Sequence, residues 1–288
     1  MRKTLYKCLN FLLFGNVFVA ICAVAQTFVT FNFLSLKPNL WVCGFLFFST
    51  LGYYNFCLLI NKSNTSLYLR HSRNNWFYAH LSLNLVLTIT AAFAIVPFFL
   101  MFNFGAKILV VFLGILAATY NFPLHWVNSK FFNLRNIKGL KLFLIAFVWA
   151  LSVVLLPVLQ ASIFIPQREI IILITKQFLL FVAITIPFDV RDFIDDKASN
   201  LKTLPIMYGV KTAYKFAIAL LLVNLALGFG FKSLIFDDKF LASVIPPVLA
   251  IFLITKSGLR KNKYYYFLYL DGVLIVQYLC FLVFDFLK

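Results

Sequence analysis

Four of the nine acidic residues of this 288-residue chain lie within eight positions, at Asp189, Asp192, Asp195 and Asp196. Carboxylates this close repel one another, and in a low dielectric the repulsion favours their neutral forms. A divalent cation removes that conflict, because carboxylate oxygens are the ligands that Mg2+ prefers. In a helical conformation Asp189, Asp192 and Asp196 share one face, and Asp195 points further round. The spacing therefore predicts a magnesium site that can hold phosphate oxygens.

A lysine follows the acidic cluster. Lys202, in the segment Leu201–Pro205, is a compact cation that can contact a diphosphate group. We therefore expect Asp189, Asp192 and Lys202 to act in catalysis, and Asp189, Asp192 and Asp196 to ligate the metal. The alternative is a solvated loop in which neighbouring lysines and an arginine balance the acids.

The elements that must position these residues are membrane-spanning helices. Hydrophobic residues make up 63% of the chain and charged residues 12%, whereas soluble domains are about half apolar and about a quarter charged. The apolar runs lack the alternation of outer-membrane strands, and a lipid-exposed backbone must satisfy its own hydrogen bonds, so we expect helices. Nine runs approach the ~20 residues that cross a bilayer: 10–33, 40–61, 78–102, 104–121, 139–161, 169–187, 213–232, 240–256 and 264–287.

The basic residues indicate the orientation. With a cytoplasmic N-terminus and nine helices, most of the 26 Lys and Arg residues fall in cytoplasmic loops, together with the acidic cluster. Topology and anionic membrane lipids explain most of the net charge of +17. A nucleic-acid partner is excluded, because the charges form no continuous basic surface. We expect one domain over 1–288, in a bacterial inner membrane, with residues 10–33 as an uncleaved first helix rather than a signal peptide.

Two details concern the ends of these helices. Pro187 disfavours a straight continuation, so the sixth helix should end near Ile186 and Pro187. Asp271 lies in the ninth run, where a charge needs a partner or water. A structural hydrogen-bonding site and a role in a central cavity are both open for Asp271.

The segment from Asp189 to Gly209 closely resembles the second aspartate motif of the UbiA family of intramembrane aromatic prenyltransferases. Tyr120 to Pro123 resembles the family's Tyr-x-x-Pro turn, and Leu140-Lys141 leading into Trp149 resembles its entry to the fifth helix. The resemblance implies an all-helical bundle around a central cavity that opens to the cytoplasm and laterally to lipid. It also implies Mg2+-dependent transfer of a polyprenyl group from its diphosphate to an aromatic or other lipophilic acceptor.

The chain departs from the family at the first aspartate motif, where opposing carboxylates hold a second Mg2+. Asn55 occupies the position of the motif's asparagine, but Leu59 and Ser63 stand where the aspartates should be. No acidic residue occurs before Arg168, so shifting the alignment cannot restore the motif.

Three explanations compete for this departure. The enzyme runs on one metal, with Asn55 and Asn61 as neutral ligands and Lys62, Arg70 or Arg73 replacing the lost charge. It uses an unusual donor or acceptor. Or it binds an isoprenoid or lipid without transferring it. A transporter is disfavoured, because matching halves show no broken-helix signals. The residues expected to contact the substrate are Asn55, Lys62, Arg70, Arg73, Tyr120 and Arg191.

Overall fold

The computed structural model describes residues 2–60, 72–121, 139–198, 201–228, 238–258, 262 and 264–287, and every secondary-structure element in these ranges is a helix. In chain order the elements are α1 Arg2–Phe14, α2 Val17–Phe33, α3 Leu40–Ile60, α5 Ser72–Ala79, α6 Leu81–Leu100, α7 Phe104–Asn121, α8 Leu140–Ala150, η3 Leu151–Leu155, α9 Leu156–Ala161, α10 Gln167–Arg191, α11 Phe193–Ala198, α12 Leu204–Tyr208, α13 Val210–Gly228, α14 Asp238–Lys256, η4 Tyr265–Leu270 and α15 Asp271–Leu287.

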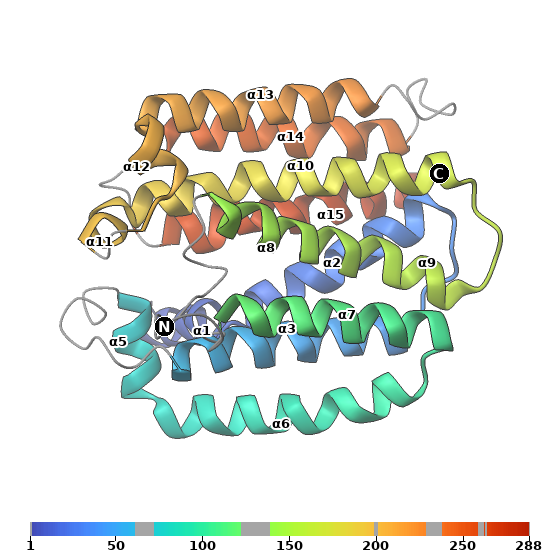
Figure 1. The fold of residues 1–288 in the computed structure, drawn as a ribbon, viewed down its shortest axis with the longest axis horizontal. Helices are drawn as coiled ribbons and strands as arrows, with labels where there is room; N and C mark the ends of the chain where they lie inside the picture. The colour runs from blue at the N-terminus through green and yellow to red at the C-terminus, as the bar shows by residue number, and fades with distance from the viewer. Residues whose placement is uncertain are drawn as a thin grey trace, which may run out of the picture.

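The long helices form a bundle whose axes run roughly parallel (Figure 1). Helix α10 crosses its middle and packs against α8, α13 and α14, while α2 packs against α3 and α15. Helix α6 covers the other side of α3. The short helices α5, α11 and α12 gather at the end of the bundle where α1 begins, and α15 finishes at the opposite end. The acidic cluster therefore lies at the same end as the first helix, as the sequence predicts.

All nine predicted apolar segments are helical in the described residues, but nine membrane crossings are not confirmed. Six helices are long and apolar enough to cross a membrane, and a seventh results if the bent pair α1 and α2 forms one span. Helices α7 and α14 are apolar but shorter. The chain is thus a multi-pass integral membrane protein of all-α fold, as expected from its composition.

The first predicted helix is not one straight element. The expectation of a helix over 10–33 is wrong at Gly15 and Asn16, where α1 and α2 meet at an angle of 63°. Asn16 has a φ of 63°, the left-handed conformation that asparagine tolerates better than most residues. Its side chain is 2% exposed, so the break lies inside the protein and carries a polar group there.

The sixth helix also differs from the prediction, because α10 continues through Pro187 to Arg191. A proline removes one N–H from the helix ladder, but the residues on both sides of Pro187 pack in the core, and this packing maintains the helix. Asp192 ends the helix, and its N–H bonds to the carbonyl of Phe188. Asp189 therefore belongs to the last turn of a long, buried helix.

Two π-helical segments interrupt the bundle, η3 and η4. Segment η3 directly precedes Leu156 and Pro157, where the proline ring has no room for the carbonyl of Val153 four residues earlier. Segment η4 leads directly into Asp271, the first residue of α15. Such segments widen a helix locally and are frequent at functional sites.

Candidate active site

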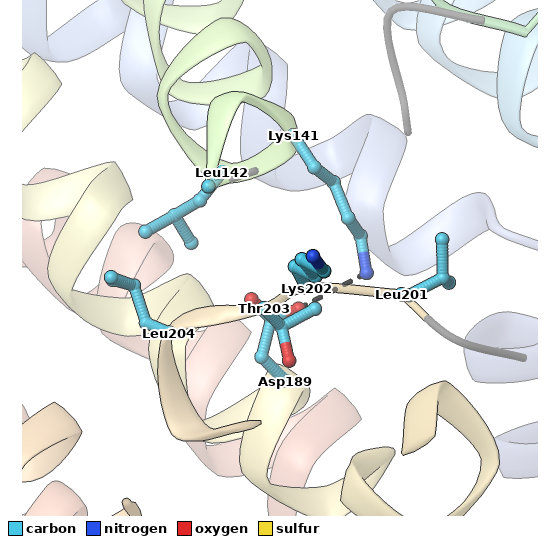
Figure 2. A pocket seen from close by; sticks show the side chains of 8 residues that line it. Lys141, Leu142, Asp189, Leu201, Lys202, Thr203 and Leu204 are labelled. Carbon is cyan, nitrogen blue, oxygen red and sulfur yellow. Dashed lines mark hydrogen bonds and ion pairs between the residues drawn. The ribbon is translucent and has the colours of Figure 1, made fainter. Parts of the chain in front are cut away.

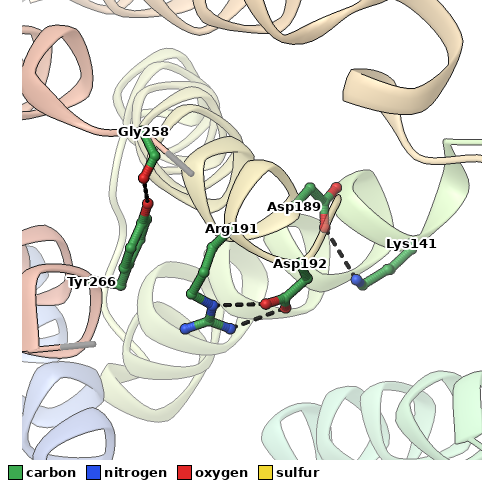
Figure 3. A network of polar contacts seen from close by, with 6 residues as sticks. All are labelled: Lys141, Asp189, Arg191, Asp192, Gly258 and Tyr266. Atoms are coloured by element: carbon green, nitrogen blue, oxygen red, sulfur yellow. Dashed lines mark hydrogen bonds and ion pairs between the residues drawn. The ribbon is translucent and has the colours of Figure 1, made fainter. Parts of the chain in front are cut away.

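Lys141 and Asp189 form an ion pair between two long helices. Lys141 Nζ lies 3.0 Å from Asp189 Oδ1, and the two side chains are 20% and 5% exposed (Figure 3). Lys141 is the second residue of α8, which follows Gly139 at a φ of 69°. The Gly139 N–H donates to the carbonyl of Lys202 over 3.2 Å. This bond ties the start of α8 to the chain that follows the acidic cluster.

A small pocket lies around this ion pair (Figure 2). Lys202, which we expect to contact a diphosphate, lines this pocket, and its side chain is exposed at the rim. The Thr203 hydroxyl oxygen is buried and has no hydrogen-bond partner within the described part of the chain. Two ammonium groups, a carboxylate and a hydroxyl thus line one pocket, a set that suits phosphate oxygens and a hard cation. The lining residues are Gly139, Lys141, Leu142, Asp189, Leu201, Lys202, Thr203 and Leu204.

Arg191 and Asp192 form a second ion pair, between neighbouring residues. Arg191 donates from Nε to Asp192 Oδ1 over 2.7 Å and from Nη2 to Oδ2 over 3.0 Å. The guanidinium carbon also lies 4.9–5.4 Å from the centroids of three aromatic rings, those of Phe188, Tyr266 and Phe267. Cation–π attraction and the bidentate bond together fix the position of this arginine.

The remaining acids of the cluster lie beyond the end of α10. Asp196, on α11, is 6% exposed; its N–H bonds to the Asp192 carbonyl and its carbonyl accepts from the N–H of Leu201. The Asp195 side chain lies outside the described residues. Because the backbone leaves helical geometry at Asp192, the i, i+3, i+7 spacing does not apply across the break. Within the described ranges, no group of three or more His, Cys, Asp or Glu side chains could hold a metal ion.

On the opposite side of the bundle, Asn55 is fully buried and its amide is occupied. Asn16 Nδ2 donates to Asn55 Oδ1 over 2.6 Å, and Asn55 Nδ2 reaches the Gly15 carbonyl at 3.4 Å. Arg73, on α5, donates from Nη2 to Asn16 Oδ1 over 2.6 Å. The predicted residues Asn55 and Arg73 therefore belong to one hydrogen-bonded chain inside the protein, with Asn16 between them.

Phe267, on η4, contacts two arginines. The guanidinium of Arg73 lies 5.4 Å from the centroid of the Phe267 ring, and that of Arg191 lies 4.9 Å from it. Asp271, the first residue of α15, follows Phe267 by four residues. The Phe267 ring thus connects the Asn55 side of the bundle to the acidic cluster.

Comparison with known proteins decides the fold. No protein-family model and no curated protein matches the sequence. Among solved structures, a UbiA homolog from Archaeoglobus fulgidus bound to GPP and Mg2+ matches at a TM-score of 0.65 and 14% identity, over 95% of this chain and 98% of that one. The apo structure of a UbiA homolog from Aeropyrum pernix K1 matches at 0.67 and 12% identity, over 94% and 98%. The chain has the UbiA fold.

A third solved structure, from work on digeranylgeranylglyceryl phosphate synthase in membranes, matches at a TM-score of 0.57 and 19% identity, over 98% of this chain and 100% of that one. The matches cover nearly the whole length of each protein. They confirm the all-helical bundle that the sequence predicts, with the UbiA fold extending from end to end of the chain.

Within the UbiA fold, some predicted site residues cannot be located. Lys62, Arg70 and Asn61 lie outside the described residues, as does the side chain of Tyr120, whose backbone belongs to the end of α7. Leu59 is described on α3, and an apolar side chain cannot ligate a metal.

Sequence reasoning assigned no role to three residues that the structure brings into the site: Lys141, Asn16 and Phe267. Lys141 belongs to the pair Leu140-Lys141, which resembles the UbiA family's entry to the fifth helix but indicates no role for the lysine. Asn16 carried a signal that could have been used, namely a polar residue directly after a glycine within an apolar run. Phe267 is one of 37 phenylalanines, and its position carries no signal of its own.

The donor set at Asp189 and Asp192 fits a divalent cation in its chemistry. Both side chains offer carboxylate oxygens at one end of the bundle, and Lys141 bonds Asp189 through Oδ1. Two features restrict the fit. Each carboxylate is paired with a cationic side chain. Asn55 is the neutral ligand expected from the other side, and its carbonyl oxygen accepts a hydrogen bond from Asn16. The residues therefore suit one ion at the acidic cluster better than a symmetric pair of ions.

Proposed function

We propose that this chain, as a single domain over 1–288, is a UbiA-family prenyltransferase of a bacterial inner membrane. It transfers a polyprenyl group from a prenyl diphosphate to an aromatic or other lipophilic acceptor, with Mg2+ as cofactor. The UbiA homologs of known structure that were solved with GPP or DMAPP and Mg2+ support the donor class and the ion. The single observation that carries the proposal is the pocket in which Lys141, Lys202 and Thr203 surround Asp189 at the end of α10.

The proposed reaction begins when the allylic C–O bond breaks and its electron pair stays on the diphosphate. A bound Mg2+, held by Asp189 and Asp192 with Asp196 nearby, would neutralise the charge that develops on the leaving group. Lys141 and Lys202 add two fixed positive charges, which stabilise the same oxygens without reorganising. The acceptor then forms a bond to the prenyl carbon and loses one proton.

The apolar interior serves the carbocation formed by this step. Water would capture an allylic cation, so the reaction needs a dry pocket whose walls tolerate positive charge. Aromatic rings do this through their electron-rich faces. Between α3, α8 and α10, Tyr54 lies edge-on to Trp149 at 6.5 Å, and Trp149 lies at 5.4 Å from Phe181 between ring centroids. We propose these three rings as candidate walls for the prenyl chain.

A second function is favoured by one specific observation. Because Asn55 has both ends of its amide engaged and Leu59 is apolar, the α3 side offers no metal ligand among the described residues. A protein with half of the acidic site could bind a prenyl diphosphate or a related lipid without transferring the prenyl group. Such a protein would show Mg2+-dependent binding and no release of diphosphate.

The test is to incubate the purified protein in detergent with Mg2+, prenyl diphosphates of increasing chain length, and aromatic and glyceryl phosphate acceptors. Acceptor-dependent diphosphate release that is lost in Asp189→Asn and Asp192→Asn supports the transferase. Glu169→Gln is the matched control, since it removes an acid at the other end of the same helix. Tight binding without release for every donor and acceptor pair indicates the binding protein. Failure to bind any prenyl diphosphate rejects both functions.

A further inference from the structure

A chain of hydrogen bonds runs from α5 into the buried break between α1 and α2. Arg73 donates to Asn16, Asn16 donates to Asn55, and Asn55 donates to the Gly15 carbonyl. Every donor points away from the arginine, so the bonds polarise one another in the same direction. Asn16 and Asn55 are 2% and 0% exposed, which keeps water from competing for these bonds. The chain therefore fixes the orientation of one guanidinium group.

The ring of Phe267 brings a second guanidinium group close to the first. Arg73 lies 5.4 Å and Arg191 4.9 Å from its centroid, so their separation cannot exceed these two distances together. Arg191 uses Nε and Nη2 for Asp192. Its Nη1 is buried and donates no hydrogen bond to any described residue. A buried guanidinium nitrogen without an acceptor is costly, and an oxyanion of a ligand would satisfy it.

These observations point to an anion site on the α3 side of the acidic cluster. Each guanidinium carries a full positive charge, and Nη1 is the Arg191 nitrogen left for a phosphate oxygen, because Nε and Nη2 bond Asp192. The burial of the Asn16–Asn55 chain reduces solvent screening, so the charges act more strongly on a ligand than surface arginines would. Asn55, in contrast, cannot turn its carbonyl oxygen to a metal without breaking its bond to Asn16.

We infer that Arg73 and Arg191 bind the diphosphate group from the α3 side, in place of a second metal ion, so that the site takes one divalent cation at Asp189 and Asp192. This inference rests on the proposed function. It assigns the Asn16 and Asn55 side chains a positioning role, since they contact Arg73 and not the ligand. Phe267 contacts both arginines and so relates their positions to each other.

The test measures metal stoichiometry and ligand affinity separately. Mn2+ serves as the spectroscopic probe for Mg2+, and geranyl thiolodiphosphate, which ionises very slowly, serves as the ligand. Electron paramagnetic resonance of free Mn2+ counts the ions bound per full-length chain with saturating ligand. We expect the wild-type protein to bind one Mn2+ per chain. Arg73→Gln should lower the affinity for the thiolodiphosphate about tenfold or more. The affinity of the ligand-free variant for Mn2+ should be unchanged.

The controls separate binding from folding. Arg73→Lys keeps the charge and loses the fork, so it should fall between wild type and Arg73→Gln. Arg168→Gln removes an exposed arginine at the far end of α10 and should leave the affinity unchanged. Two Mn2+ per wild-type chain would overturn the inference even if every variant misfolded. An affinity of Arg73→Gln within about twofold of wild type would also overturn it and would leave the arginine a structural role beside Asn16. Absence of any metal-dependent binding by the wild type would instead reject the proposed function.

Discussion

Lys141 on α8 donates a hydrogen bond of 3.0 Å to Asp189 on α10, although 48 residues separate them. The bond joins α8 to α10 beside the pocket that Lys202 and Thr203 also line. Asp189 is 3% exposed, and Lys141 places a positive charge beside its carboxylate. A bound divalent cation could compensate for the same charge, and this equivalence leads to the first prediction.

Lys141→Gln should destabilise the protein by about 1.5–3 kcal/mol in the absence of divalent cations, the typical contribution of a charged hydrogen bond. Mg2+ should then stabilise the variant more than the wild type, because the ion replaces the missing positive charge. Thermal unfolding in detergent with and without Mg2+ measures both effects. An equal Mg2+ response in variant and wild type would show that the ion does not bind beside Asp189.

The contact between α3 and α6 gives a second prediction. A Cβ atom added at Gly44 would lie closer to a ring carbon of Phe98 than packed atoms can approach. Gly44→Ala should therefore destabilise the bundle by about 1–3 kcal/mol, and adding Phe98→Leu should relieve most of the loss. Gly114→Ala on α7 is the matched control, since no described heavy atom lies within 4 Å of its added Cβ. Unfolding by a denaturing detergent compares the three variants; equal stability of the two alanine variants would contradict the prediction.

Asn16 allows its backbone and side-chain roles to be separated. Asn16→Gly keeps the left-handed conformation available but removes the bonds to Arg73 and Asn55. Asn16→Ala removes the same bonds and adds about 1–2 kcal/mol of backbone strain. Both variants should lose affinity for prenyl diphosphates to a similar degree, while the alanine variant unfolds at a lower temperature. Wild-type affinity in Asn16→Gly would show that the side chain does not orient Arg73.

The polar contact between α10 and α13 gives a fourth prediction. Lys176 is 3% exposed; its Nζ donates to the carbonyl of Asn224 over 2.8 Å, and Asn224 Nδ2 donates back to the Lys176 carbonyl over 2.6 Å. Asn224→Leu should cost about 1–3 kcal/mol, because the Lys176 carbonyl loses its side-chain donor and Nζ loses its 3.3 Å contact with Asn224 Oδ1, while the bond to the backbone carbonyl remains. Lys176→Met in the same chain should recover part of that loss, since a buried amine with a single remaining acceptor is removed. A double-mutant cycle of detergent unfolding measures the coupling, and additive effects would show that the two side chains act independently.

The sequence predicted the helical segments well because apolar length is a local property. Each of the nine predicted runs is helical in the described residues, and the end of the bundle that carries Asp189 and Lys202 was expected to hold the site. The break at Asn16 and the continuation through Pro187 were missed, since both depend on packing and not on propensity. At Asn16 the helix breaks where the apolar run predicts that it continues. At Pro187 the helix continues where the proline predicts that it ends.

The contacts of the site were harder to predict than its residues. Lys141 meets Asp189 from 48 positions away, and Arg73 meets Asn16 from 57. Such pairs depend on which helices are neighbours and how each is rotated, and hydrophobic periodicity is weak in helices that are apolar on all sides. Arg73 is a candidate from its charge alone, whereas its partner Asn16 and the ring of Phe267 are recognised only once the helices are assembled.

The π segment η4 has a consequence for how this protein can tolerate changes in length. It holds Tyr265–Leu270 in a wider turn than an α-helix, so it accommodates residues that an ordinary helix would have to shift. Deleting Leu268 would let the ladder close as an α-helix and would leave the helix on either side close to its present direction. Phe267 and Asp271 would then stand three positions apart instead of four, which still places them on one face of the helix. The loss of a single codon here would therefore be absorbed locally, whereas in a regular part of α15 it would turn every following side chain by roughly 100°.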